Sequence, residues 1–353
     1  MRRILFHIKI FVAVICLPGC KQPGKQVASA NLPPQIQTLN WKIERYSKEM
    51  DHLFETDVTL DILGSGMMWA EGPLWIPEKK WLLCSDVKAN RIYRWTESGG
   101  FEVYLEPSGF TGTVTDSREP GSNGLALDNQ GRLVLCQHGN RQVARMEGGL
   151  ENPKPNFEIL AEEFEGWRLN SPNDLVYDSK GNLFFTDPPF GLSEALDEDP
   201  NKELPFQGIY RLDKKNQLVL VNKEISRPNG IAFSPDEKKL YVSNTDGENA
   251  KWFALTLNQD LVVSKIEEIY NATALIGKEI GYPDGIKVDP KGNIFTAGPG
   301  GLWVFNKHYE LIGKIKPDAW VSNCAFDNTY ENLYITADSY LLRIKLQNNS
   351  VKN

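Results

Sequence analysis

The sequence has 353 residues, of which 41% are hydrophobic and 24% charged, values typical of a folded globular protein rather than a disordered chain. A formal net charge of −7 argues against sequence-independent binding of nucleic acid, because such proteins neutralise phosphates with clustered lysine and arginine. Four histidines and no Cys-x-x-Cys motif offer little for a zinc site of nitrogen and sulfur ligands, so a metal, if one binds, would be held by oxygen atoms.

Residues 1–20 have the pattern of an export signal. Arg2, Arg3 and Lys9 precede or enter an apolar stretch that is too short to remain in a membrane as a spanning helix. The stretch ends in the sequence LPGC at Cys20, which resembles the lipobox at which bacterial lipoproteins are cleaved and acylated. We therefore predict export to the bacterial cell envelope and a lipid anchor at Cys20, with an ordinary secretory peptide as the alternative.

Three segments lie between this signal and the main body of the chain. Residues 21–40 are polar and non-periodic, and we expect them to form a tether. Residues 41–56 predict a short helical extension, because four apolar residues recur at helical spacing: Ile43, Tyr46, Met50 and Leu53. Residues 58–63 alternate apolar and polar side chains, a pattern typical of a β-strand.

A repeated segment occupies residues 57–347. Each copy begins with a polar residue, usually followed by glycine, and continues as strand, polar turn and strand, with further strands behind. The six lead residues lie 38–56 residues apart: Glu71, Asn123, Asn173, Asn229, Asp284 and Ser322. Six such units without helical periods predict a single all-β domain, a six-bladed β-propeller. The last unit is one strand short, so we predict that residues 58–63 complete the sixth blade and close the ring.

Three cysteines remain in the predicted domain, each within an apolar strand-like run. Their number is odd, and free cysteine packs well as a small apolar residue. We therefore expect buried thiols rather than a disulfide or a nucleophile at Cys84, Cys136 and Cys324.

All six lead residues carry a side-chain oxygen, and equivalent positions of a propeller converge on its central channel. Glu71 and Asp284 could neutralise a divalent cation, while the asparagine amides supply further oxygen ligands. Calcium suits such a set, because it takes six to eight oxygen ligands in irregular geometry, whereas magnesium requires a stricter octahedron. The alternative is that Asn-Gly and Asp-Gly serve only as turn dipeptides.

Several motifs together resemble the gluconolactonase, senescence-marker-protein and luciferin-regenerating-enzyme family of six-bladed propellers. They cover about residues 60–346 in the order AEGPLW (70–75), REPGSNG (118–124), LNSPND (169–174), FTDPPFG (185–191), RPNG (227–230) and YPDG (282–285). The resemblance implies a cation-dependent hydrolase that opens a sugar lactone. Carried over by motif, it implies the metal ligands Glu71, Asn173, Asn229 and Asp284, with Asn173 alternatively a substrate contact. We expect Ca²⁺, while Zn²⁺, Mn²⁺ or Mg²⁺ could replace it.

The same resemblance implies that Asp284 is the catalytic residue, which holds and deprotonates the attacking water. Asn123 is expected to line the pocket. Arg118 lies in a loop long enough to reach the channel mouth, so we expect it to contact substrate. His138 follows a strand of the second unit and could also face substrate, with a purely structural role as the alternative.

Two other functions stay open at this point. One is a related metal-dependent esterase or phosphotriesterase, and the other is a non-catalytic envelope propeller that binds a ligand. The joint presence of all four implied metal ligands argues against the second. We expect a small-molecule partner, no nucleic-acid partner and a monomeric protein.

Overall fold

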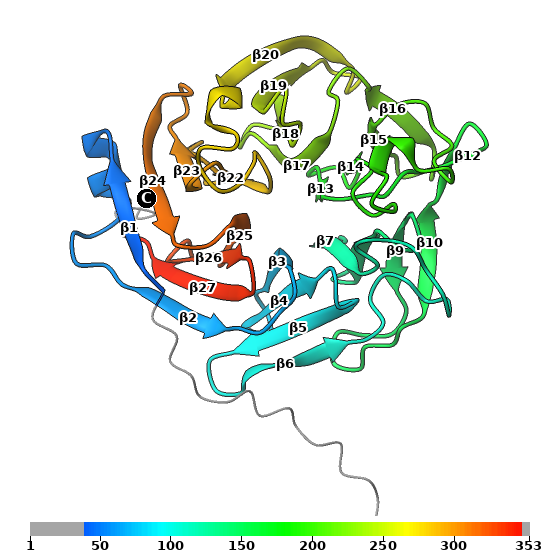
Figure 1. The fold of residues 1–353 in the computed structure, drawn as a ribbon, viewed down its shortest axis with the longest axis horizontal. Helices are drawn as coiled ribbons and strands as arrows, with labels where there is room; N and C mark the ends of the chain where they lie inside the picture. Colours follow the sequence, from blue (N-terminus) through cyan, green and yellow to red (C-terminus); the bar gives the residue numbers. More distant parts are fainter. Residues whose placement is uncertain (1–38, 348–353) are drawn as a thin grey trace, which may run out of the picture. The chain divides into compact units, whose positions relative to one another are not determined.

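Alternation of apolar and polar residues builds antiparallel strands throughout the computed structural model, which describes residues 39–347. The predicted signal peptide, Cys20 and nearly all of the predicted tether lie outside the described residues. Apart from one two-stranded hairpin, the strands form six sheets of four or five strands that are arranged as a ring around a central axis (Figure 1). The prediction of an all-β six-bladed propeller is therefore confirmed.

The first three blades follow one another along the chain. Blade 1 contains β3 (Ala70–Ile76), β4 (Trp81–Asp86), β5 (Arg91–Thr96) and β6 (Gly100–Leu105). Blade 2 contains β7 (Ser122–Leu127), β8 (Leu133–Gln137), β9 (Gln142–Met146) and β10 (Phe157–Ala161). Blade 3 contains β13 (Leu175–Tyr177), β14 (Leu183–Asp187), β15 (Gly208–Leu212) and β16 (Leu218–Asn222). A separate hairpin precedes blade 3 and consists of β11 (Glu163–Phe164) and β12 (Trp167–Arg168).

The last three blades include both ends of the described chain. Blade 4 contains β17 (Pro228–Phe233), β18 (Lys239–Asn244), β19 (Lys251–Leu257) and β20 (Val263–Asn271). Blade 5 contains β21 (Ile286–Val288), β22 (Ile294–Gly298), β23 (Gly301–Phe305) and β24 (Leu311–Pro317), with β1 (Trp41–Arg45) at its outer edge. Blade 6 contains β25 (Val321–Phe326), β26 (Asn332–Ala337), β27 (Tyr340–Lys345) and β2 (Leu60–Gly64).

Ring closure follows the predicted scheme. The N-terminal strand β2 pairs antiparallel with the C-terminal strand β27, with Leu60 opposite Ile344 and Ile62 opposite Leu342. The outer edge of β27 is thereby covered, which removes a free row of backbone donors and acceptors. Strands from near the two ends of the described chain, β2 and β27, thus share one sheet.

The predicted helical extension is wrong over most of its length. Residues 41–45 form the strand β1, which pairs with β24, and only a single 3₁₀ turn, η1 (Lys48–His52), follows. The exposed edge of β24 offers backbone partners that outweigh the weak helical pattern of the segment. The tether also ends earlier than predicted, because the carbonyl of Asn40 already accepts a hydrogen bond from Asp318 N–H at 2.7 Å.

Six apolar clusters fill the six interfaces between neighbouring blades, including the interface between blades 6 and 1. Both faces of the middle strands of each blade are buried, which explains why the sequences of these strands are nearly continuous apolar runs. Cys84, Cys136 and Cys324 are free, fully buried thiols in these clusters, as predicted. Within residues 39–347, no helix is both long and apolar enough to cross a lipid bilayer.

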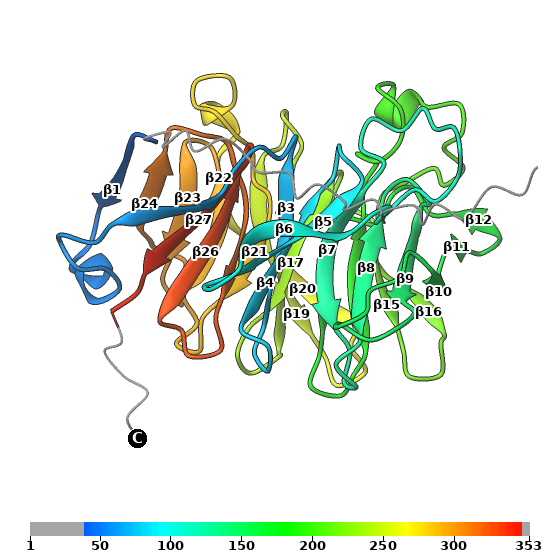
Figure 2. The same cartoon turned by 90° about the horizontal axis from the view of Figure 1, so that it is seen from below.

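The longest connections rise from one face of the ring. Figure 2 shows there the green and yellow loops that carry two short 3₁₀ turns, η2 (Leu196–Glu198) and η3 (Thr273–Leu275). Short polar turns make up much of the opposite face. Long loops on one end of a rigid scaffold are the usual place for a binding or catalytic site.

Candidate active site

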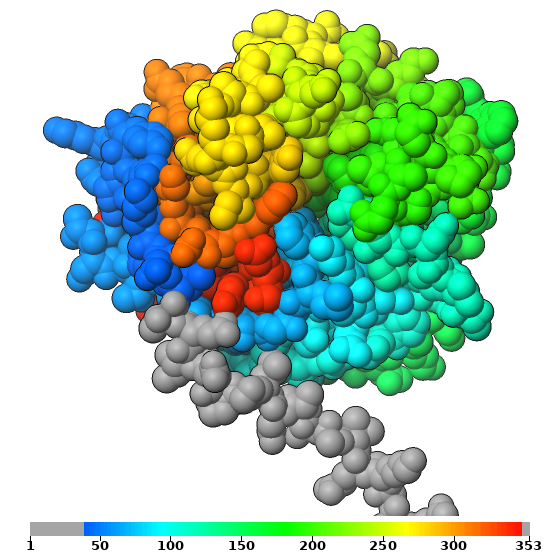
Figure 3. Space-filling view, viewed as in Figure 1, coloured from blue at the N-terminus to red at the C-terminus, as the bar shows by residue number. Residues whose placement is uncertain are grey.

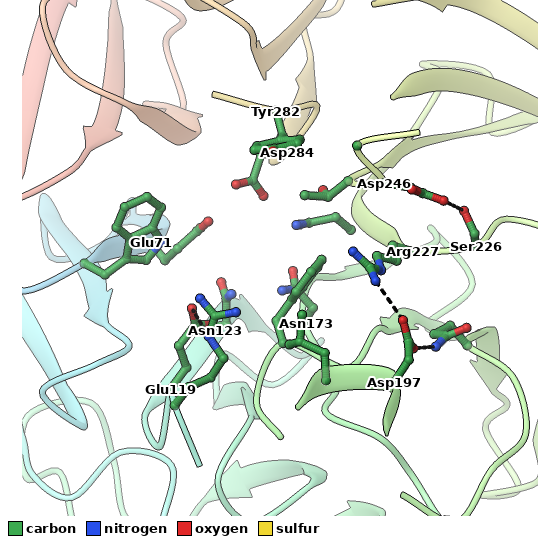
Figure 4. Close-up of a pocket in the computed structure, with 18 of the residues that line it drawn as sticks. Glu71, Glu119, Asn123, Asn173, Asp197, Ser226, Arg227, Asp246, Tyr282 and Asp284 are labelled. Atoms are coloured by element: carbon green, nitrogen blue, oxygen red, sulfur yellow. Dashed lines mark hydrogen bonds and ion pairs between the residues drawn. The ribbon is translucent and has the colours of Figure 1, made fainter. Parts of the chain in front are cut away.

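A pocket of about 980 Å³ opens on the loop-bearing face near the axis of the ring, where the surface in Figure 3 is hollowed. Five of the six lead residues line it: Glu71, Asn123, Asn173, Asn229 and Asp284. Each of these side chains is at most 7% exposed. In Figure 4 the carboxylates of Glu71 and Asp284 point toward the same central space, with Asn123 and Asn173 on the side facing blades 2 and 3. The structure thus brings together the residues that the repeat pattern singled out.

The direction of Glu71 depends on the glycine that follows it. Gly72 has a φ of +50°, and a Cβ at this position would lie 2.0 Å from the carbonyl oxygen of Asn123. Only glycine fits this bend in β3. The Gly72 N–H donates to Glu71 Oε2 at 2.9 Å, so the bend both permits and stabilises the inward carboxylate.

Hydroxyl groups on neighbouring strands hold the lead residues in place. Ser85 Oγ donates to the carbonyl of Asn123 at 2.8 Å, and Thr186 Oγ1 donates to the carbonyl of Asn229 at 2.7 Å. Thr296 Oγ1 donates in the same way to the carbonyl of Gly285, next to Asp284. The first two contacts fix the backbone of a lead residue and the third fixes the residue that follows one, and all of them leave the lead side chains directed at the pocket.

The two inward carboxylates are costly to ionise together. Burial raises the pKa of Glu71 to about 7, opposed by hydrogen bonds from Gly72 and Asn323. Burial and the nearby negative charge of Glu71 raise the pKa of Asp284 well above its usual range. A positive charge between these carboxylates would remove this penalty.

The pocket also contains acceptor atoms without partners. Among the described residues, neither Asn123 Oδ1 nor Asp284 Oδ1 has a hydrogen-bond partner, although both atoms are buried. Among residues 39–347, no group of three or more His, Cys, Asp or Glu side chains is placed to hold a metal ion. Two repelling carboxylates and several oriented amides fit a hard divalent cation.

A polar network, not predicted from the sequence, lies next to Glu71. Asn323 Nδ2 donates to Glu71 Oε2 at 3.2 Å, and Lys287 Nζ lies 3.4 Å from Asn323 Oδ1 and 3.4 Å from Asp174 Oδ2. The pairing of β25 with β26 shifts in register between Val321 and Asn323. Lys287 therefore neutralises a buried carboxylate and orients the amide that holds Glu71.

We expect the substitution Lys287→Met to lower the free energy of unfolding by about 1–3 kcal/mol, because it leaves the Asp174 carboxylate buried without its cation. Urea denaturation followed by circular dichroism measures the change. The matched control is Lys238→Met, since Lys238 Nζ lies at a similar 3.5 Å from Asp236 but both side chains are more than half exposed. This control should change stability by less than about 0.5 kcal/mol. Equal effects of the two substitutions would contradict the role given to Lys287.

Ser322 and His138 do not have the positions that the sequence predicted. Ser322 does not line the pocket, because its hydroxyl donates to the carbonyl of Ala70 at 2.6 Å and so joins blade 6 to blade 1.

His138 is fully buried behind the pocket wall, where the segment at Gly191 packs against its Cβ. Its ring nitrogens lie 3.4 Å from Glu119 Oε2 and 3.4 Å from Asn173 Nδ2. His138 therefore supports Asn173 instead of facing substrate.

Arg118 lines the pocket. Its guanidinium Nε is 3.8 Å from Glu119 Oε1 and 3.9 Å from Glu194 Oε2, too far for a strong hydrogen bond to either carboxylate. The backbone is held in place because Arg118 N–H donates to the carbonyl of Leu192 at 3.0 Å. The side chain thus remains available to a ligand in the pocket.

These features define a six-bladed propeller with a buried acid–amide site on its axis. Residues 69–339 match the family described as the SMP-30/Gluconolactonase/LRE-like region. A gluconolactonase of Zymomonas mobilis is 33% identical over 314 residues, which make up 86% of each chain. Pentonolactonase XacC of Haloferax volcanii is 25% identical over 271 residues, 75% of this chain and 80% of that relative. A solved gluconolactonase structure from Xanthomonas campestris has a TM-score of 0.74 and 31% identity, covering 86% of this chain and 94% of that one.

The chain therefore belongs to the SMP-30/gluconolactonase/LRE-like family. The predicted family and the predicted enzyme class, a hydrolase, are confirmed by these relatives.

Proposed function

We propose that this protein is a divalent-cation-dependent hydrolase that opens sugar lactones. The observation that carries the proposal is the pair of buried carboxylates, Glu71 and Asp284, directed into one pocket with oriented amides around them. Relatives named gluconolactonase and pentonolactonase over most of their length support the choice of substrate class. We propose Ca²⁺ as the cation, because the available donors are all oxygen atoms.

In this proposal four side chains hold the cation: Glu71, Asn173, Asn229 and Asp284. A divalent cation bound there supplies positive charge to the carbonyl oxygen of the ester, where negative charge develops during attack. Asn123 Oδ1 and the guanidinium of Arg118 remain for contacts to the hydroxyl groups of the sugar.

In this proposal Asp284 is also the base that accepts a proton from the attacking water. Its Oδ1 has no partner among the described residues and faces the pocket, so it can accept a proton from a water molecule. The water oxygen then bonds to the carbonyl carbon, the ring C–O bond breaks, and the ring oxygen takes up the proton that Asp284 accepted and becomes a hydroxyl group. The product is the open-chain hydroxy acid.

The direct test is a pH-indicator assay over sugar lactones, acyl lactones and aryl esters, corrected for spontaneous hydrolysis. The protein should first be dialysed against a chelator and then supplied separately with Ca²⁺, Zn²⁺, Mn²⁺ or Mg²⁺. We expect hydrolysis of sugar lactones that depends on the added cation. Failure to exceed the spontaneous rate with any lactone and any cation would refute the proposal.

We expect the chelated protein to gain stability as the pH falls from about 8 to about 5. The folded-state pKa of Glu71, about 7, lies above its ordinary value of 4.5, so the folded state binds a proton that the unfolded state has released. This contribution to stability is fully present below pH 4.5 and is lost as the pH rises through 7. Denaturation in urea at several pH values measures it, with about 2–3 kcal/mol as the expected scale.

The Glu71→Gln protein serves as the control for this pH dependence. It keeps a side chain of similar shape that cannot ionise, so the part of the pH dependence due to Glu71 should disappear. A wild-type protein whose stability is constant or increases from pH 5 to 8 would contradict the assignment.

We also propose that the protein is exported and anchored to a membrane of the cell envelope through Cys20. The support is the LPGC sequence after a basic and apolar leader. Cell fractionation tests it, because Cys20→Ser should move the protein from the membrane fraction to a soluble one. Equal distribution of both proteins would exclude a lipid anchor at this residue.

A further inference from the structure

Three aromatic side chains form one wall of the pocket beside the carboxylates: Trp69, Tyr282 and Trp320. We call them the aromatic wall. The Trp69 and Trp320 rings meet edge to face with centroids 5.4 Å apart, and Tyr282 stacks on Trp320 at 5.5 Å. All three residues are only partly buried and line the pocket, where Lys88 Nζ lies 5.0 Å from the centroid of the Trp69 ring. Trp69 and Tyr282 each precede a proposed metal ligand by two residues, which places the wall directly beside the reaction centre.

The aromatic wall is held in place by carboxylates on its backbone. Asp86 Oδ1 accepts a hydrogen bond from Trp69 N–H at 3.0 Å, and Asp338 Oδ2 accepts one from Trp320 N–H at 2.9 Å. The Asp338 N–H donates in return to the carbonyl of Trp320 at 2.8 Å. A wall that is ordered before binding costs little conformational entropy when a ligand stacks on it.

The loops of blades 2 to 4 give the pocket a different, polar side. Arg118, Lys202 and Arg227 line it together with acidic side chains, and Arg227 forms an ion pair with Asp197 at 2.8 Å. At about 980 Å³ the pocket is at the upper end of the roughly 300–1,000 Å³ range of small-molecule sites, so one sugar ring leaves much of it unfilled. The remaining space has one aromatic and one hydrogen-bonding side.

We propose, on the basis of the function proposed above, that the preferred substrate is an aldonolactone that carries a second sugar ring. The aromatic wall binds the C–H face of that second ring, because the positive C–H edge of a sugar complements the negative face of an aromatic ring. The hydroxyl groups of the same ring point toward the polar side of the pocket. Trp320 is the central residue of the wall, since it contacts both other rings.

The test compares glucono-1,5-lactone with cellobiono-1,5-lactone as substrates of the cation-loaded protein. We expect wild-type kcat/KM to be about tenfold higher for the disaccharide lactone, mainly through a lower KM. In Trp320→Ala the ratio of the two kcat/KM values should fall about tenfold, and Trp320→Phe should restore most of it. The control is Trp167→Ala, a substitution on β12 of a residue that is 54% exposed and outside the pocket.

Equal wild-type kcat/KM values for the two lactones would overturn the inference, as would an unchanged ratio in Trp320→Ala. Calorimetric titration with cellobionate and with gluconate separates this inference from the proposed reaction. If neither lactone is hydrolysed, the proposed function fails, yet tighter binding of cellobionate that is lost in Trp320→Ala still supports the aromatic wall. Equal affinity for the two acids would overturn it.

Discussion

The Asp284→Asn protein is expected to hydrolyse glucono-1,5-lactone about 10²–10⁴-fold more slowly than the wild type, the usual contribution of a positioned base. The amide keeps the shape of the side chain but can neither accept the proton of the attacking water nor neutralise a cation. Because Asp284 is only 7% exposed, bulk water cannot readily take over either role of its carboxylate. Initial rates at a fixed cation concentration, corrected for spontaneous hydrolysis, measure the loss.

The control for this substitution is Asp260→Asn, which removes an exposed carboxylate far from the pocket. This substitution should leave the rate of hydrolysis unchanged, which would show that the loss of one negative charge alone does not slow the reaction. Thermal denaturation of Asp284→Asn shows whether the fold is retained, and removal of a repelling carboxylate should make the metal-free variant at least as stable as the wild type. A wild-type rate in Asp284→Asn would exclude Asp284 as the base.

Removal of divalent cations is expected to lower the melting temperature by several degrees. A cation at about 100 times its dissociation constant stabilises the folded state by about 2.7 kcal/mol, because it binds only where Glu71 and Asp284 are brought together. Melting curves in chelator and across a Ca²⁺ titration measure the effect, and Mg²⁺, Mn²⁺ and Zn²⁺ rank the alternatives.

The double substitution Glu71→Gln and Asp284→Asn supplies the control for cation binding. Its melting temperature should not respond to the added ion, because both ionisable ligands are gone. A wild-type melting temperature that is the same in chelator and in millimolar concentrations of each of the four cations would contradict a metal site in this pocket.

The fold could be predicted because every blade repeats the same local pattern. Period-two alternation and polar turns identify the strands of one unit, and the unit count then dictates a ring. Even the pairing of β2 with β27 follows from a missing strand in the last unit. The extension at residues 41–56 was predicted wrongly, because its first residues pair with the free edge of β24. The local sequence does not indicate this pairing with a distant strand.

The residues of the site that occupy equivalent positions of the repeat could be predicted from the sequence. Equivalent positions of a propeller converge on the axis, so Glu71 and Asp284 could be placed in one pocket before any coordinates were known. Asn323 was missed because it follows the lead position Ser322, and the equivalent position of four other units is a glycine without a side chain. The aromatic wall was missed because its residues precede the lead positions and meet only across three different blades.

The outer strand β1 has a mechanical consequence for the closed ring. A force applied through the N-terminus reaches the pairing of β1 with β24 before it reaches the pairing of β2 with β27. The five paired residues of β1 can therefore detach from β24 first, while the pairing of β2 with β27 that closes the ring stays intact. Attachment at this end of the polypeptide is thus compatible with an undisturbed pocket.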